Sequence, residues 1–301
     1  MQERSYTPDE AFAYCQTVTN AHYENFPVAS LFLPEEKRPY IQALYAFSRI
    51  ADDMADESVL GGGERLMKLD DWELKLRECY EGRADHPVFI ALSETVRRAE
   101  IPIGPLLDLL AAFRRDVNQN RYGTYAELLG YCTCSANPVG RLVLMIFGIR
   151  DEELYGLSDR ICTGLQLANF WQDLSLDALK DRLYIPLEDM ARYSYTVEDW
   201  KRGASGENFK ALMRFEVERT RELFYQGAAL PSRVHRELSL ELKLVWFGGM
   251  AVLKAVERGS YDVYRRRPVL SGFNKLMVLA RGLFRNDLSN FGREKKPWLL
   301  E

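Results

Sequence analysis

Oxygen-bearing side chains recur at helical spacing within residues 166–177 of this chain. Asn169, Asp173 and Asp177 stand four residues apart, and Gln166 stands one turn before Asn169. Residues three and four apart share one face of a helix, so these four side chains form one stripe. Asn and Asp are poor residues for a helix interior. A helix that repeats them among leucines and aromatic residues predicts a functional stripe.

A second stripe occurs earlier in the chain. Asp52 and Asp56 stand four apart, Arg49 lies one turn before Asp52, and Tyr45 lies one turn before Arg49. One such pair on a helix is usually a solvated face. Two stripes, each with apolar neighbours, favour a shared cation site. Mg²⁺ takes oxygen ligands and commonly combines one or two carboxylates with substrate phosphates, so we expect a site completed by a diphosphate.

Helical periodicity covers most of the sequence and must position both stripes. It predicts helices over 8–24, 34–57, 64–82, 87–100, 105–117, 125–134, 139–148, 151–179, 187–192, 196–202, 207–228 and 231–257. The sequence shows no convincing strand pattern, internal repeat or low-complexity linker. We therefore predict one all-α domain over 1–301, with a core over about 8–270. The basic, amphipathic tail 271–301 either packs on this bundle or lies on a membrane surface.

Composition excludes several classes of function. The 301 residues include 40 basic and 44 acidic side chains, and the net charge of −4 gives no electrostatic case for nucleic acid. Five scattered cysteines and three histidines predict reduced thiols rather than a metal-thiolate site. The amino terminus lacks a signal-peptide core, and no apolar run reaches the about 18 residues of a spanning helix. We predict a cytoplasmic protein.

Residues 22–57, 131–140 and 165–186 together resemble the squalene/phytoene synthase family, the head-to-head trans-isoprenyl diphosphate synthases. The resemblance rests on the two stripes and on two further motifs that occur in the family's order, Tyr45-Ala46-Phe47-Ser48-Arg49 and Arg182-Leu183-Tyr184-Ile185-Pro186. It implies a terpenoid-synthase-like helical bundle around a deep central cavity. It also implies that the stripes face each other and that Mg²⁺ ions bridge them to a prenyl diphosphate.

The resemblance implies roles for individual residues. The metal side comprises Asp52, Asp56, Asn169, Asp173 and Asp177. The residues that contact the diphosphate or shape the site include Tyr45, Arg49, Gln166, Arg182 and Tyr184. The residue types add His22 and Arg265 as donors to phosphate oxygens and Tyr131 as an aromatic wall. For these three residues a purely structural role stays open, namely a core histidine, a solvated helix end and an ordinary core tyrosine.

Departures from the family pattern narrow the expected reaction. Glu24 stands where condensing members commonly carry lysine, Gln172 stands in place of an arginine, and Asn137 brings a polar group toward the cavity. These changes resemble the bacterial hydroxysqualene synthases of hopanoid biosynthesis, which take presqualene diphosphate. We expect Mg²⁺-dependent ionisation, rearrangement of the cation and capture of water, with Asn137 or Gln172 positioning that water.

Two alternatives stay open from the sequence. The first is condensation of two prenyl diphosphates, from farnesyl diphosphate to presqualene diphosphate or squalene, or from geranylgeranyl diphosphate to phytoene. The second is a non-catalytic, membrane-associated helical scaffold. Peripheral contact with the inner membrane for the apolar product, and channelling with neighbouring enzymes of the pathway, are also open.

Overall fold

The computed structural model describes residues 6–21, 33–57, 59–269, 272–285 and 288. The predicted all-α class is confirmed, because the described residues contain helices and no β-strand beyond an isolated bridge between Arg121 and Leu183. The helices are α1 Pro8–Ala21, α2 Arg38–Asp56, α3 Gly62–Tyr80, α4 Pro87–Arg98, α5 Gly104–Asn118, α6 Tyr125–Ser135, α7 Asn137–Ile146, α8 Glu152–Leu179, α9 Leu187–Arg192, α10 Val197–Lys201, α11 Glu207–Gly227, α12 Leu230–Arg233, α13 Arg236–Arg258 and α14 Gly272–Phe284.

The predicted helices differ from the observed ones mainly at their ends. The helix predicted over 231–257 is two helices, because Val234 and His235 adopt extended backbone between α12 and α13. The glycine triplet 61–63 forms the start of α3. Gly61 is its N-cap, and the Gly61 amide donates to the Glu64 carboxylate at 3.0 Å.

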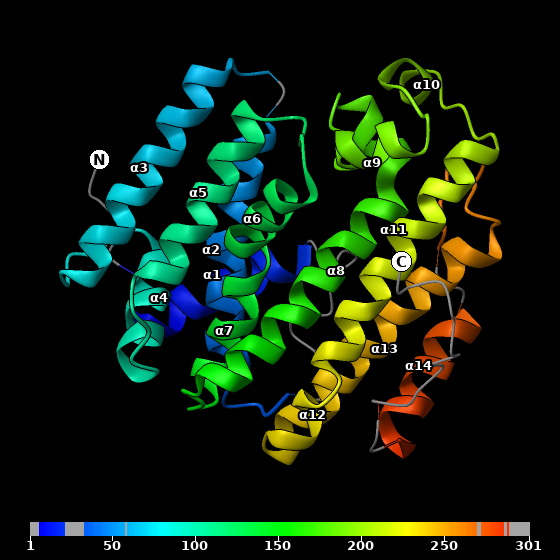
Figure 1. Ribbon diagram of the computed structural model, residues 1–301. Coiled ribbons are helices and arrows are strands. Elements are labelled where there is room, and N and C mark those ends of the chain that lie inside the picture. Colours follow the sequence, from blue (N-terminus) through cyan, green and yellow to red (C-terminus); the bar gives the residue numbers. More distant parts are fainter. Residues whose placement is uncertain (1–5, 22–32, 58, 270–271, 286–287, 289–301) are drawn as a thin grey trace.

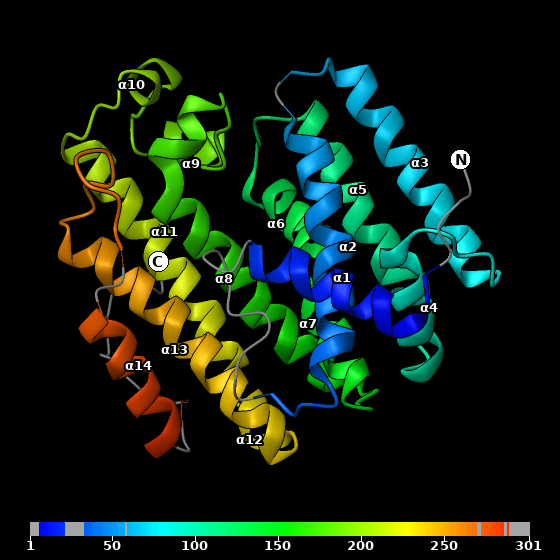
Figure 2. The same ribbon diagram turned by 180° about the vertical axis from the view of Figure 1, so that it is seen from behind.

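Helix α8 runs through the middle of the bundle, with α5, α6 and α7 on one side and α11 and α13 on the other (Figures 1 and 2). It packs against α6, α7, α11 and α13, whereas α2 packs among α1, α3, α4 and α5. Two apolar clusters follow this division. The α2 side buries Phe47, Trp72 and Phe89, and the α8 side buries Trp171 and Trp246. Each acidic stripe therefore stands on its own packed support.

Small residues bring α8, α11 and α13 close together. A Cβ atom on Gly249 of α13 would overlap the Phe224 ring of α11, and one on Gly164 of α8 would lie 3.1 Å from the same ring. Gly249, in the middle of the apolar helix α13, therefore marks a close approach of this helix to α11. Trp171 of α8 also donates to the Thr220 hydroxyl of α11 at 2.7 Å. These contacts fix the rotation of α8 about its axis.

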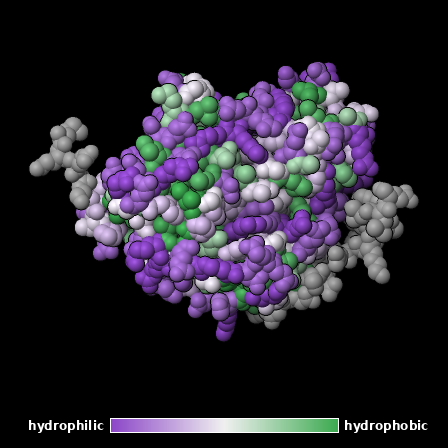
Figure 3. Space-filling view, turned by 60° about the vertical axis from the view of Figure 1, so that its left-hand side comes forward, coloured by the Kyte–Doolittle hydropathy of each residue, from purple (hydrophilic) through white to green (hydrophobic). Residues whose placement is uncertain are grey.

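The described part of the tail packs on the bundle. A Cβ on Gly282 of α14 would lie 2.7 Å from Leu244 of α13, so the two helices approach closely. Leu276 and Leu283 remain more than half exposed on α14. Among the described helices, none is both long and apolar enough to cross a membrane. The face that Figure 3 brings forward is largely hydrophilic, with hydrophobic residues in separate groups.

Candidate active site

The stripe on α2 lies at the carboxyl end of that helix and is surrounded by cations. Arg49 donates to Asp52 at 3.0 Å and also contacts Asp53. The two oxygens of Asp56 accept from Lys180 at 2.8 Å and from Arg182 at 2.6 Å. Because Lys180 and Arg182 directly follow α8, Asp56 joins the end of α2 to the end of the other stripe helix.

The stripe on α8 has a different set of partners. The Asp173 carboxylate, 16% exposed, accepts from Arg267 Nε at 2.5 Å. Within the described part of the chain, Asp177 makes no ion pair, and burial together with the charge of Asp173 raises the pKa of Asp177 to about 7. Asn169 is exposed and Gln166 is half-buried, one and two turns before Asp173. An incoming cation would relieve the crowding of negative charge along this helix.

The carboxylates of the two stripes also act on one another electrostatically. Burial and the neighbouring Asp56 raise the pKa of Asp52. Burial acts to raise the pKa of Asp56 as well, but hydrogen bonds from Lys180 and Arg182 hold it below its ordinary value. The charge of Asp56 also contributes to the raised pKa of Asp177, and the ion pairs of Asp56 with Lys180 and Arg182 bring the end of α8 to this stripe.

The donor set suits a hard divalent cation. It consists of carboxylate and amide oxygens, which Mg²⁺ prefers, with no thiolate among the stripe residues. Among the described residues, no three acidic, histidine or cysteine side chains already surround a common point. Arginine and lysine side chains hold several of the oxygens instead. The stripes therefore fit a metal that is bound together with substrate oxygens better than a prebuilt protein cage.

An aromatic wall lies beside the carboxylates. Tyr184 stacks on Phe170 of α8 with ring centroids 3.7 Å apart and an angle of 5° between the planes. Tyr131 of α6 and Tyr122 lie 6.0 and 5.9 Å from Tyr184. The segment that carries Tyr184 is fixed because the Leu183 amide donates to the Asn120 carbonyl at 3.0 Å. Such faces can stabilise a nearby carbocation by about 0.5–2 kcal/mol each.

Asp116 of α5 is a site residue that sequence reasoning missed. Its Oδ2 atom accepts from the Tyr131 hydroxyl at 2.9 Å, and its Oδ1 atom is buried without a hydrogen-bond partner in the described residues. Burial, and then the charges of Asp52 and Asp56, raise the pKa of Asp116 to about 7. No spacing signal marks this residue, because the other acidic residue of α5, Asp108, is eight positions away, and Asp116 reaches the stripes only through the fold.

Other predicted residues lie in places that change their interpretation. Asn137 is buried, and its side-chain oxygen accepts from Thr163 at 2.9 Å, so it serves the contact between α7 and α8. Gln172 donates to the Pro268 carbonyl at 2.5 Å. The amide nitrogen of Gln172 and the oxygen of Asn137 are thus engaged by protein atoms, which weakens the assignment of both as water-positioning groups.

The remaining predictions concern three residues. Arg265 has an exposed side chain and no contact with the α8 stripe, and Arg267, two residues later, makes that contact instead. Tyr45 is half-buried on α2, where the charges of Arg49 and Asp52 act on its hydroxyl. His22 lies outside the described residues.

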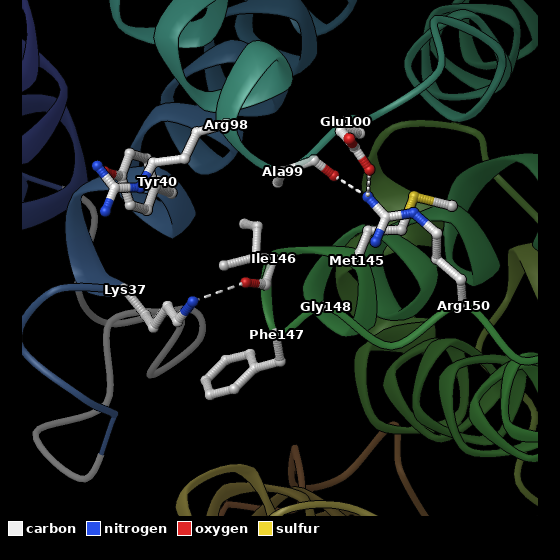
Figure 4. Close-up of a pocket in the computed structure, with 10 residues that line it drawn as sticks. All are labelled: Lys37, Tyr40, Arg98, Ala99, Glu100, Met145, Ile146, Phe147, Gly148 and Arg150. Carbon is white, nitrogen blue, oxygen red and sulfur yellow. Dashed lines mark hydrogen bonds and ion pairs between the residues drawn. The ribbon is translucent and has the colours of Figure 1, made fainter.

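A separate cavity of about 230 Å³ lies at the other end of α2 (Figure 4). Its walls come from the start of α2 and the ends of α4 and α7. Two of its cations are bound to carbonyls at helix ends, because Lys37 donates to Ile146 at 3.1 Å and Arg150 donates to Ala99, and the third, Arg98, lies over the Tyr40 ring. The cavity is roughly 22 Å along α2 from Asp52, at 1.5 Å per residue. The acidic stripes, not this cavity, are therefore the candidate active site.

Comparison with known proteins fits this geometry. The family model for squalene/phytoene synthase matches residues 19–274. The chain belongs to the squalene/phytoene synthase family. This family resemblance, inferred from the stripe motifs, is confirmed.

Individual members of the family are similar over most of the chain. The hydroxysqualene synthase of Sinorhizobium fredii is 36% identical over 212 residues, which cover 70% of this chain and 71% of that one. The phytoene synthase of Arthrospira platensis is 29% identical over 286 residues, 91% and 92% of the two chains. The crystal structure of squalene synthase HpnC from Alicyclobacillus acidocaldarius, 40% identical, superposes with a TM-score of 0.80 over 84% of this chain and 95% of that one. The predicted terpenoid-synthase-like bundle is thereby confirmed.

Proposed function

We propose that this member of the family converts presqualene diphosphate and water to hydroxysqualene and diphosphate, with Mg²⁺ bound between the stripes. The observation that carries the proposal is that residue 172 is a neutral glutamine. Gln172 brings no positive charge, and its amide is bound to the Pro268 carbonyl. A site that lacks the arginine of condensing members has fewer cations to hold a second diphosphate.

The reaction balances without a reductant. The bond between the cyclopropylcarbinyl carbon and the diphosphate oxygen breaks, and its electron pair leaves with the diphosphate. After the carbon skeleton rearranges, a water oxygen forms the new carbon–oxygen bond, and the water proton is released. The same residue set would serve a reductive ending only with a hydride donor.

The stripe residues would hold the metal and the leaving group. Asp52, Asp56, Asn169, Asp173 and Asp177 are the proposed ligands. Mg²⁺, when bound, supplies a Lewis acid that withdraws charge from the diphosphate oxygens. Arg182, already bound to Asp56 at 2.6 Å, is placed to meet the charge that develops on the leaving group.

The aromatic wall and Asp116 would act on the carbocation and on water. Phe170, Tyr131 and Tyr184 present ring faces that exclude bulk solvent from the cation. Asp116 and Tyr131 form a polar pair in that wall, with one Asp116 oxygen still unpartnered among the described residues. We assign to this pair the orientation of the attacking water, in place of Asn137 and Gln172.

A condensing reaction is the second candidate. The observation that favours it is the match to the Arthrospira phytoene synthase, which spans 91% of this chain, against 70% for the Sinorhizobium hydroxysqualene synthase.

We place the enzyme in the cytoplasm at the surface of the inner membrane, where an apolar product can leave, next to enzymes that supply the diphosphate.

One assay separates the two candidates. The purified protein is incubated with Mg²⁺ and either presqualene diphosphate, farnesyl diphosphate or geranylgeranyl diphosphate, and the products are identified by mass. We expect hydroxysqualene from presqualene diphosphate and no C30 or C40 product from the shorter substrates. Squalene, presqualene diphosphate or phytoene formed from those substrates would establish condensation instead.

A further inference from the structure

The segment 260–269, which we name the strap, leaves α13 and returns across α8. Ser260 and Tyr261 both have positive φ angles, 53° and 62°, so the chain reverses direction sharply at its start. Residues other than glycine adopt this left-handed conformation at a cost in free energy, and they keep it where surrounding packing enforces it. The strap therefore has a defined course from its first residue.

The root of the strap is fixed in the core. Tyr261 and Val263 are buried, and the Tyr264 ring packs on Phe209 with the ring centroids 5.1 Å apart. Asp262 also accepts from the Ser205 hydroxyl at 3.2 Å. These contacts leave only the tip, residues 265–269, to be held by α8.

The tip is held by two adjacent residues of α8. Gln172 Nε2 donates to the Pro268 carbonyl at 2.5 Å, and Asp173 accepts from Arg267 Nε at 2.5 Å. Consecutive residues of the strap thus bind consecutive residues of the helix. The Arg267 side chain is 44% exposed, so its ion pair with Asp173 lies at the surface of the site. Exposed ion pairs are weak and exchangeable.

The chemistry at position 172 matters for this arrangement. A neutral amide can donate to Pro268 while Arg267 lies beside it. An arginine at 172 would place a second positive charge next to Arg267 and oppose its approach to Asp173. A neutral donor at 172 therefore favours contact between Arg267 and the acidic stripe.

We propose that Gln172 is a positioning residue that latches the strap, and that the latched Arg267 competes with the divalent cation for Asp173. The second half of this inference rests on the proposed function, because it takes Asp173 as a metal ligand. With the latch closed, Arg267 neutralises Asp173 before the cation binds. With the latch broken, Asp173 is freer to bind the cation, and the tip of the strap moves away from α8.

The first test measures the strap without metal or substrate. Arg265 and Arg266 are exposed and provide trypsin sites in the tip. Trypsin needs a locally opened segment, so we expect Gln172→Leu to raise the rate of cleavage after these residues about tenfold. Cleavage after the exposed Arg83, between α3 and α4, is the internal standard. Ser175→Ala, one turn along α8, is the control variant and should match the wild type.

The second test measures metal binding without diphosphate, by titration with Mn²⁺ followed by electron paramagnetic resonance. We expect Gln172→Leu and Arg267→Gln to bind Mn²⁺ about threefold to fivefold more tightly than the wild type, because an exposed ion pair is lost as a competitor. Arg267→Gln leaves α8 unaltered, so it keeps the test decisive if Gln172→Leu folds poorly.

The outcomes separate the latch from the proposed function. Unchanged cleavage of the tip in a folded Gln172→Leu protein overturns the latch, whatever the substrate assay gives. Unchanged Mn²⁺ affinity in Arg267→Gln overturns the competition. A condensing product in the substrate assay would overturn the proposed function and leave the cleavage result standing.

Discussion

The two acidic stripes differ in where their counter-charges come from. On α2, Asp52 and Asp56 are met by Arg49 of the same helix and by Lys180 and Arg182, which directly follow α8. On α8, Asp173 pairs with Arg267, which belongs to the strap. The first stripe is therefore met by cations of α2 itself and of the segment that follows α8, and the second by a cation of the strap.

This difference indicates a division of work. A carboxylate held by fixed scaffold cations, such as Asp56, keeps its ionised form, and the pKa of Asp56 is accordingly lowered by Lys180 and Arg182. The α8 stripe stays electrostatically frustrated, since burial and Asp173 raise the pKa of Asp177 to about 7. We infer that protein cations already compensate the negative charge of the α2 stripe, whereas the negative charge of the α8 stripe is compensated when the divalent cation binds.

Removing one carboxylate from each stripe should have the largest effect. Asp52→Asn and Asp173→Asn should each lower kcat by about 10²–10³, the loss typical of a preorganised electrostatic group. The two variants should differ at the strap, because only Asp173→Asn removes the partner of Arg267. Steady-state kinetics and tryptic cleavage after Arg266 check both parts. Near-normal turnover in either variant would exclude that residue from the metal site.

Much of the fold could be predicted because its signals are local. Residues four apart share one face of a helix. The sequence alone therefore places Asp52 and Asp56 on one face of α2, and Asn169, Asp173 and Asp177 on one face of α8. The helix ends were harder. The break at Val234–His235 follows no glycine or proline at those positions, so periodicity alone continued the helix through it.

Three features of the site depend on tertiary contacts and had no sequence signal. Asp116 belongs to no acidic stripe on α5 and becomes a site residue only because Tyr131 and Arg182 approach it. Arg267 rather than Arg265 reaches α8 because of the course of the strap, which no pattern encodes. Gln172 departs from the family pattern in the sequence itself, but its partner, the Pro268 carbonyl, lies 96 residues away.

The free energy of unfolding should depend on pH through a buried carboxyl group on α11, the helix that packs behind the α8 stripe. Glu216 of α11 is fully buried and shares Arg219, as does Asp189, so two carboxylates face one guanidinium. Burial raises the pKa of Glu216 to about 8. Since the folded pKa exceeds the unfolded value, its contribution to stability is complete at acidic pH and is lost as pH rises toward 8.

The expected slope is a fall in unfolding free energy of up to about 1.4 kcal/mol per pH unit between roughly pH 5 and 8. Urea denaturation at pH 6, 7 and 8 measures it. Glu216→Gln keeps the shape of the side chain and should reduce the slope in this range, while Asp116 and Asp177, whose pKa values are also raised to about 7, keep the remainder. An equal slope in the two proteins would assign the pH dependence to other groups, such as those of the α2 stripe.

A matched glycine pair tests how tightly the α8 side is packed. Gly249→Ala should lower the unfolding free energy by about 1–3 kcal/mol, because the new methyl overlaps Phe224 behind α8. Gly248→Ala meets no atom within 4 Å and should raise stability by about 0.5–1 kcal/mol through helix propensity. Thermal denaturation compares them. Equal shifts in Tm would show that the α8 side tolerates repacking.

The smallest expected effect concerns the outer cation of the α2 stripe. Lys180 is 57% exposed where it meets Asp56, whereas Arg182 is 16% exposed on the same carboxylate. Lys180→Gln should therefore change the unfolding free energy by less than about 1 kcal/mol, as exposed ion pairs do. Because Arg182 still donates to Asp56 in this variant, turnover should also stay close to that of the wild type. A loss of turnover as large as that of Asp52→Asn would show that the α2 stripe depends on one exposed cation, Lys180. The α2 stripe would then resemble the α8 stripe, which depends on Arg267, and the contrast between the two stripes would disappear.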